Sequence, residues 1–155
     1  MKLFKKTLLI LAIFAGFTFQ SCSSDDDSGS QNDDTYIRFT AGGEDFNYAD
    51  PATAGSQNLT INGQNGNDNT VSTYSSVSIW FPLQITTGTY DFSGDFFQDG
   101  DYKLNLESTA LNLDGWSETG SVIITAISSD YIEGTFTGTI EGVAITNGEF
   151  RAFNL

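Results

Sequence analysis

Residues suited to ligand binding gather in segment 94–102, whose sequence GDFFQDGDY mixes acids with aromatic side chains. Its acids are Asp95, Asp99 and Asp101. Carboxylate oxygens are the ligands that Ca²⁺ prefers, and the ion takes about six to eight oxygens. The spacing differs from that of an EF-hand loop, so calcium is expected here from residue types alone. The alternative is a hairpin loop with solvated acids.

Aromatic side chains in and near this segment suggest a second chemistry. Phe96 and Phe97 are adjacent within it, and the two tryptophans of the chain, Trp80 and Trp116, lie on either side. Aromatic rings can stack on the apolar faces of sugar rings while amides and carboxylates bind the hydroxyl groups. These residues therefore predict a glycan platform. The alternative is that both tryptophans pack between sheets, where their large apolar area would stabilise a core.

The composition argues against catalysis. The chain has no His and a single Cys, which removes imidazole-based triads and most transition-metal sites. The 20 Asp and Glu residues make a pair of neighbouring carboxylates common by chance, so they do not by themselves indicate a glycosidase. We therefore expect a binding or scaffolding module and not an enzyme.

The charge balance excludes one class of partner. Lys and Arg number 6 against 20 acids, which gives a formal charge of −14. Nucleic acids require a basic surface, so neither DNA nor RNA is expected to bind. The single Cys also rules out a framework of disulfide bonds within the chain.

The first 21 residues have the pattern of an export signal. Lysines at positions 2, 5 and 6 precede an apolar run from Leu8 to Phe19. This run is too short to cross a hydrocarbon core of roughly 30 Å comfortably as a helix. Residues 1–21 are therefore predicted to be a signal peptide.

The only cysteine, Cys22, follows the apolar run directly after Ser21. This is where a lipoprotein signal peptidase cleaves after a diacylglyceryl group has been attached to the thiol. We therefore expect Cys22 to carry the lipid that anchors the protein to a membrane. The alternative is an ordinary secreted protein with one free thiol.

An acidic cluster comes next in the sequence. It consists of Ser23, Ser24, Asp25, Asp26 and Asp27. The cluster resembles the signal that sorts Bacteroidetes-type lipoproteins to the outer face of the outer membrane. That resemblance implies a surface-exposed location. The alternative is a solvated tether, and residues 22–34 are expected to form a lipidated, acidic and flexible tether in either case.

Alternating apolar residues predict short β-strands throughout residues 35–155. The clearest strand is Tyr131–Ile140, where apolar residues and glycines occupy one face and polar residues the other. In Ser121–Ser128 both faces are apolar, which predicts a central strand covered on both sides. Short turns at Ser129-Asp130 and Glu141-Gly142 complete a three-stranded meander over residues 119–153. Its last strand needs a β-bulge at Asn147-Gly148, because the apolar face changes there.

Other strands follow the same reasoning. Thr35–Ala41 and Asp45–Ala49 flank Gly42-Gly43 and predict a hairpin. Further strands are expected around Leu59 and Ile61, at Val77–Leu83, at Thr89–Phe92 and at Tyr102–Leu106. About nine short strands in one domain predict an antiparallel β-sandwich or a small barrel.

Several of these segments are similar to one known group of proteins. The segments are Gly88-Thr89-Tyr90, Gly120–Thr125, Ile132–Phe136 and Ile145–Phe150. They resemble landmarks of small Bacteroidetes surface lipoproteins with a single all-β domain. The resemblance implies fold and location alone, because the group carries no activity that could be transferred.

These observations predict a surface lipoprotein anchored in the outer membrane by its lipid. Its domain, residues 35–155, is expected to bind a glycan or a surface protein. The alternatives are a Ca²⁺-stabilised adhesion domain and a lipocalin-like carrier of a small apolar ligand.

Overall fold

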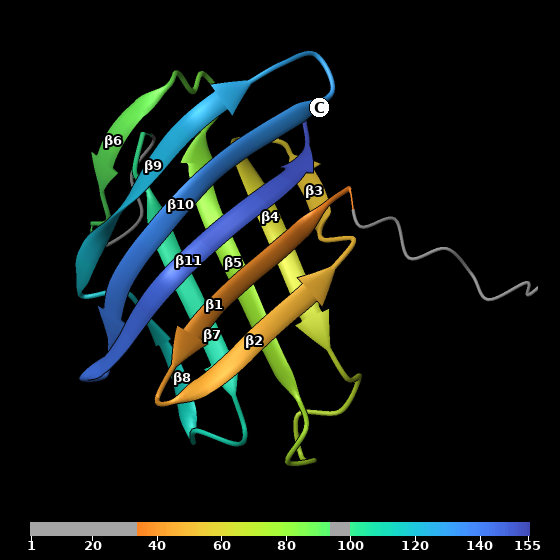
Figure 1. The fold of residues 1–155 in the computed structure, drawn as a ribbon, viewed down its shortest axis with the longest axis vertical. Coiled ribbons are helices and arrows are strands. Elements are labelled where there is room, and N and C mark those ends of the chain that lie inside the picture. The colour runs from red at the N-terminus through yellow and green to blue at the C-terminus, as the bar shows by residue number, and fades with distance from the viewer. Residues whose placement is uncertain (1–33, 94–99) are drawn as a thin grey trace, which may run out of the picture. The chain divides into compact units, whose positions relative to one another are not determined.

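The computed structural model describes residues 34–93 and 100–155, which fold into two antiparallel sheets (Figure 1). The six-stranded sheet contains, in spatial order, β2 (Glu44–Ala49), β1 (Tyr36–Ala41), β11 (Val143–Phe153), β10 (Tyr131–Ile140), β9 (Thr119–Ile127) and β6 (Gly88–Asp91). The five-stranded sheet contains β3 (Ala52–Gly55), β4 (Asn58–Asn65), β5 (Ser75–Pro82), β7 (Lys103–Ser108) and β8 (Leu113–Trp116). The described segments include no helix long and apolar enough to cross a bilayer.

The sheets pack face to face, so the sandwich is confirmed and the barrel is not formed (Figure 1). Two strands beyond the predicted nine are present, β3 and β8. Both have only four residues, ATAG and LDGW, and neither sequence shows an extended alternation of apolar and polar residues. Pairing with β4 and β7 therefore defines these strands more than their own sequences do.

The core lies between the sheets and is rich in aromatic side chains. Phe81 from the five-stranded sheet contacts Phe150 from the six-stranded sheet at a ring-centroid distance of 5.8 Å. Phe136 lies 6.5 Å from Phe150 by the same measure. Burial of a Phe side chain stabilises a fold by about 1.5–3 kcal/mol. These contacts fix which face of each strand remains outside.

The predicted bulge in β11 is present. Phe136 pairs with Gly148 and Gly138 pairs with Ile145, so two residues of β11 lie opposite one of β10. Asn147 adopts a φ of 54° at this point. The extra residue restores the register, and Ile145 and Phe150 are both buried.

The prediction that β9 is covered on both sides is wrong. Ile123 on its outer face is 41% exposed, because nothing packs on that side of the six-stranded sheet within the described residues. A second bulge at Thr125 separates the pairs Gly134–Ile124 and Glu133–Ala126. The bulge reverses the alternation, so Ala126 shares a face with Glu133 while Ile127 pairs with Ile132.

The predicted hairpins at Gly42-Gly43 and Glu141-Gly142 are confirmed. Tyr36 pairs with Ala49 and Ala41 pairs with Glu44, so β1 and β2 form a hairpin around Gly42-Gly43. β10 and β11 join at Glu141-Gly142, where both residues have positive φ values of 49° and 79°. Positive φ at both central residues matches the twist that a two-residue hairpin needs.

Candidate functional site

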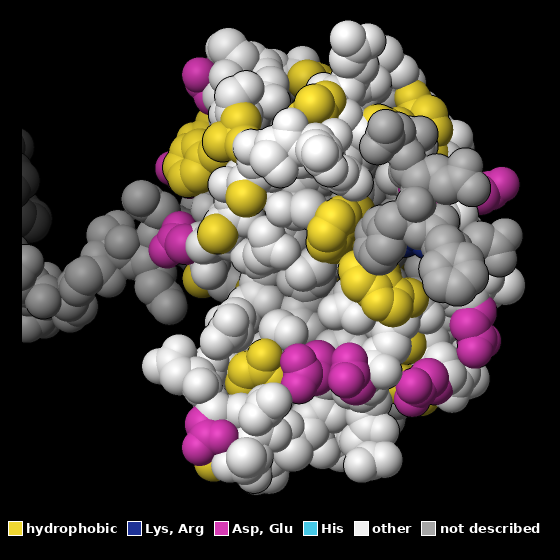
Figure 2. Space-filling model, turned by 180° about the vertical axis from the view of Figure 1, so that it is seen from behind, with side chains coloured by type: hydrophobic (Ala, Val, Ile, Leu, Met, Phe, Trp, Pro, Cys, Tyr) yellow, Lys and Arg dark blue, Asp and Glu magenta, His cyan; other side chains and the backbone are white. Residues whose placement is uncertain are grey.

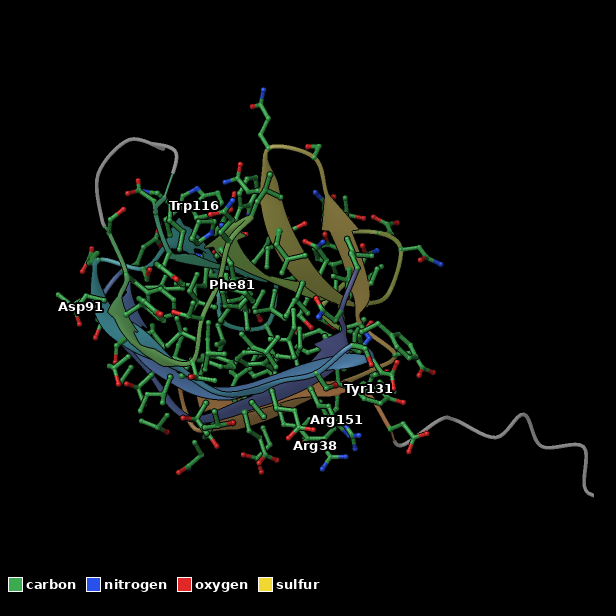
Figure 3. The ribbon with its side chains drawn as sticks, turned by 90° about the horizontal axis from the view of Figure 1, so that it is seen from above. Arg38, Phe81, Asp91, Trp116, Tyr131 and Arg151 are labelled. Carbon is green, nitrogen blue, oxygen red and sulfur yellow. The ribbon has the colours of Figure 1, made fainter. Side chains whose placement is uncertain are left out.

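The outer face of the five-stranded sheet carries both tryptophans. Trp80 lies in β5 between Ile79 and Phe81, which are fully buried, so its own side chain is on the outer face. Trp116 at the end of β8 is 38% exposed. The alternative that both tryptophans pack between the sheets is therefore wrong. In Figure 3, Trp116 lies on the outer side of the five-stranded sheet, whereas Phe81 points into the space between the two sheets.

The two indoles meet although β7 separates their strands. Trp80 pairs with Lys103 of β7, and Asn105, two residues further along β7, pairs with Trp116. The rings approach across β7 to a centroid distance of 5.8 Å with an interplanar angle of 71°. This edge-to-face geometry is favourable for aromatic pairs. The sheet thus brings the two predicted aromatic residues together.

A row of uncharged polar side chains leads to Trp116. Asn62 of β4, Ser78 of β5 and Asn105 of β7 are consecutive partners across the sheet, and Asn105 pairs with Trp116. Ser78 Oγ donates to Asn62 Oδ1 at 2.7 Å, and Asn62 Nδ2 donates to Thr60 Oγ1 at 3.2 Å. Asn105 Nδ2 donates to the carbonyl of Gly115 at 2.8 Å. These bonds fix the orientation of the amides while leaving each group further capacity for hydrogen bonds.

Acidic side chains occupy the next row of the same face. Glu107 of β7 pairs with Asp114 of β8. The hydroxyl of Tyr74 donates to Glu107 Oε2 at 3.3 Å. Glu107, Asp114 and Glu141 line one depression of about 400 Å³. Figure 2 shows acidic side chains in a line across this side of the molecule.

Sequence reasoning missed these polar and acidic residues as parts of a site. Alternation alone places Asn105 and Glu107 on the outer face of their strand. It does not reveal which residues of β4, β5 and β8 lie beside them. That information depends on pairing between strands that are distant in sequence.

Lys103 is an unusual member of this face because it is only 2% exposed. Its Nζ atom donates to the carbonyl of Ser93 at 3.1 Å and lies 4.0 Å from Asp101 Oδ2. A buried ammonium group needs such partners to compensate for lost hydration. Ser93 and Asp101 lie on the two sides of segment 94–99, so Lys103 holds both flanks of that segment at one place.

The predicted calcium ligands are only partly described. Asp95 and Asp99 lie outside the described residues, whereas Asp101 approaches Lys103. Within residues 34–93 and 100–155, no three His, Cys, Asp or Glu residues form a group that could hold a metal ion. The calcium hypothesis involves the segment between these ranges and stays a prediction.

Other predicted site residues also lie outside the described ranges. They are Phe96 and Phe97 of the aromatic segment, the lipidation residue Cys22, and the export cluster Ser23, Ser24, Asp25, Asp26 and Asp27. Their roles stay predictions.

The outer face of the six-stranded sheet has different chemistry (Figure 3). Arg38 stacks on Tyr36 with its guanidinium carbon 4.3 Å from the ring centroid, and Arg151 stacks on Tyr131 at 4.1 Å. Arg151 Nε also lies 3.0 Å from Glu133 Oε1. Arg38 likewise lies 3.9 Å from Glu149, so each of these two arginines has a glutamate beside it.

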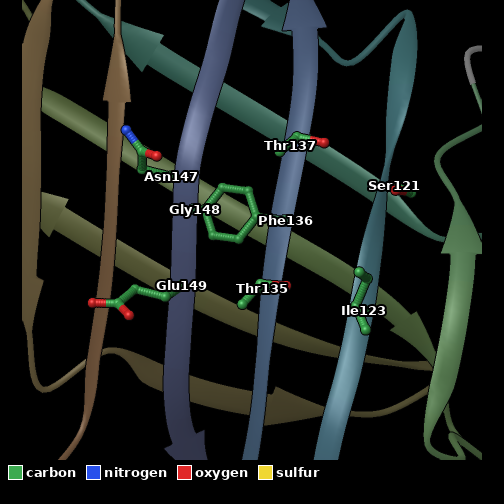
Figure 4. A pocket seen from close by; sticks show the side chains of 8 residues that line it. All are labelled: Ser121, Ile123, Thr135, Phe136, Thr137, Asn147, Gly148 and Glu149. Carbon is green, nitrogen blue, oxygen red and sulfur yellow. The ribbon is translucent and has the colours of Figure 1, made fainter.

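A shallow depression of about 420 Å³ lies on this same face (Figure 4). Its rim includes Ile123, Thr135, Thr137 and Glu149. A Cβ atom at Gly148 would lie 2.3 Å from the carbonyl oxygen of Phe136, so glycine is required for the close approach of the two strands. The depression lacks an exposed aromatic ring, and we therefore regard the tryptophan face as the candidate site.

Two tyrosines, the buried Tyr48 and the half-buried Tyr102, remain protonated far above neutral pH. Burial, as the main cause, raises the pKa of Tyr48 to about 12. Burial and the neighbouring Tyr90 raise the pKa of Tyr102 to about 12, and the two rings stack at a centroid distance of 4.2 Å. Both phenols serve the interior of the sandwich and do not form part of the tryptophan face.

Comparison of the chain with protein-family models, curated proteins and solved structures finds no match. The chain has a single all-β domain with two antiparallel sheets. The function must therefore be argued from the site itself.

Proposed function

We propose that the protein is a non-catalytic binding module whose five-stranded sheet binds a glycan on its outer face. The observation that carries the proposal is the contact between the rings of Trp80 and Trp116 beside a row of oriented amides and hydroxyls. An indole face covers the apolar side of a sugar ring. Polar groups held at the edge of that ring then bind its hydroxyls.

The alternatives have less support. A lipocalin-like carrier needs an internal cavity, whereas the facing sheets here contact one another through Phe81 and Phe150. A calcium-stabilised adhesion domain depends on Asp95 and Asp99, which lie outside the described residues. The glycan proposal depends on contacts that lie within them.

The location is proposed from the sequence. Cys22 is the only cysteine and follows an apolar run, which supports lipidation, and the acidic cluster after it supports export to the cell surface. The chain would then belong with small Bacteroidetes surface lipoproteins that it resembles. A lipid anchor would hold the binding face at the outer membrane, where extracellular glycans arrive.

The proposal is tested by binding of the purified protein to a broad set of polysaccharides. We expect at least one to shift the tryptophan fluorescence, because sugar stacking changes the surroundings of Trp116. Trp116→Ala should abolish binding. The matched control is Phe153→Ala, which removes a 47% exposed aromatic side chain from the other sheet and should leave binding unchanged. Equal loss in both variants would contradict the proposed site.

A further inference from the structure

The charge of the tryptophan face restricts the kind of glycan that it can accept. Glu107 and Asp114 form a cross-strand pair in the row next to Trp116. The nearest cation, Lys103, is only 2% exposed and is engaged with Ser93 and Asp101. Two like charges at 4 Å repel by about 1 kcal/mol in water and by about 4 kcal/mol near a protein surface. A carboxylated or sulfated sugar would meet this repulsion, whereas an uncharged sugar would not.

The orientation of the two indoles restricts the form of the glycan. Their planes are inclined by 71°, so a flat and rigid surface can lie against the face of only one ring. A soluble chain can turn about its glycosidic bonds and present one sugar to each ring. The geometry therefore favours a single chain in solution over the surface of a crystalline polysaccharide.

The polar row indicates the direction of the chain. Asn62, Ser78 and Asn105 lead across neighbouring strands to Trp116. With adjacent strands about 4.8 Å apart, the row from β4 to β8 is roughly 14 Å long. That length suits a short oligosaccharide. Amides and hydroxyls both donate and accept hydrogen bonds, which matches the hydroxyl groups of uncharged sugars.

From these observations we infer that the ligand of this face is a single, soluble, uncharged glycan chain running across β4, β5, β7 and β8. The inference rests on the proposed glycan-binding function and specifies its ligand class. Trp80 and Trp116 stack on the sugars at one end, and the polar row binds hydroxyls along the chain. Glu107 and Asp114 exclude anionic sugars.

Affinity electrophoresis of the purified full-length protein, in a non-ionic detergent without sugar groups, tests the ligand class. The neutral probes are mixed-linkage β-glucan, galactomannan and soluble starch. The anionic probes are polygalacturonate, alginate and chondroitin sulfate. Sedimentation with microcrystalline cellulose and chitin tests rigid surfaces. We expect binding to at least one neutral soluble probe and to none of the others. Affinity should not change between low and high NaCl, because no ion pair forms with the ligand.

Variants locate the binding on the face. Trp116→Ala should weaken neutral binding by about tenfold or more, which corresponds to about 1.4 kcal/mol. Asn62→Ala, at the far end of the polar row, gives a second variant if the first does not fold. The double variant Glu107→Gln/Asp114→Asn keeps the shape of the face and removes its charge. It should retain neutral binding and gain binding to at least one anionic probe.

The outcomes separate this inference from the proposed function. Binding only to anionic or crystalline probes, with loss in Trp116→Ala, would overturn the inference and leave glycan binding standing. Neutral binding that persists in folded Trp116→Ala and Asn62→Ala would overturn the assignment to this face. If no probe binds, the glycan-binding function itself is overturned.

Discussion

Tyr48 shows how a single polar side chain is accommodated in the sandwich. Its ring stacks against Phe39 at a centroid distance of 6.1 Å, and its hydroxyl donates to Ser75 Oγ at 2.9 Å. Burial disfavours the phenolate, which raises the pKa of Tyr48 from 10.0 to about 12. The proton is therefore bound more tightly in the folded state than in the unfolded state.

This difference predicts a loss of stability at alkaline pH. The contribution of protonated Tyr48 is fully present below pH 10, and it is lost as the pH rises from about 10 to about 12. The total corresponds to roughly 2–3 kcal/mol of the free energy of unfolding. Denaturant unfolding from pH 8 to pH 12 measures it.

The variant Tyr48→Phe separates this effect from a general alkaline unfolding. Near neutral pH it should cost about 0.5–1.5 kcal/mol, because the hydrogen bond to Ser75 is lost. Above pH 10 its stability should fall less steeply than that of the unaltered protein. Tyr102→Phe provides the comparison, since burial also raises the pKa of Tyr102. An unchanged slope in Tyr48→Phe would contradict the assignment.

The candidate site could be predicted from the sequence only one residue at a time. Trp80 and Trp116 were identifiable because their side chains suit sugar stacking. Their contact was not predictable, because it requires β5, β7 and β8 to pair in one register. The polar partners Asn62 and Asn105 have no unusual local sequence, so only the sheet reveals them.

At the scale of elements, alternation predicted most strands because their two faces meet different surroundings. β10 spans Tyr131–Ile140 as expected, since its inner residues face the core and its threonines face outward. β9 was correctly predicted as a strand, but its apolar residues on both faces wrongly suggested that it is covered on both sides. Its outer face is instead exposed, and the bulge at Thr125 reverses the inward and outward alternation of its last residues. Such a bulge depends on how β9 pairs with β10, so the sequence of β9 alone gives little indication of it.

The bulge in β11 gives a prediction at this scale. Asn147 has a φ of 54°, a region that costs a β-branched residue about 1–2 kcal/mol. Asn147→Val should therefore lower the free energy of unfolding by about that amount. Asn147→Gly, the matched variant, should be nearly neutral because glycine adopts positive φ freely. Chemical denaturation measures both, and equal destabilisation would show that the side chain of Asn147, and not its φ, matters.

At the scale of the whole molecule, the two outer faces differ in their side chains. The five-stranded sheet presents Trp116 and the polar row, whereas the six-stranded sheet presents arginines that stack on tyrosines. The chain enters the domain at β1, which belongs to the six-stranded sheet. An anchor attached before β1 therefore joins the sandwich through the sheet that does not carry the proposed glycan face.

The anchor itself is tested by Cys22→Ala in cells. Without the thiol no diacylglyceryl group can be attached, so the protein should move from washed membranes to the soluble fraction. Immunoblotting of both fractions measures this shift. Ser23→Ala is the matched control, because it alters the neighbouring residue, keeps the thiol and should leave the protein in the membrane. Replacing Asp25, Asp26 and Asp27 together by Ala should preserve the membrane fraction but remove sensitivity to protease added to intact cells, since the role proposed for the acidic cluster is surface export and not lipidation. Cys22→Ala protein that remains in washed membranes would refute the lipid anchor, and a protease-resistant unaltered protein would refute the surface location alone.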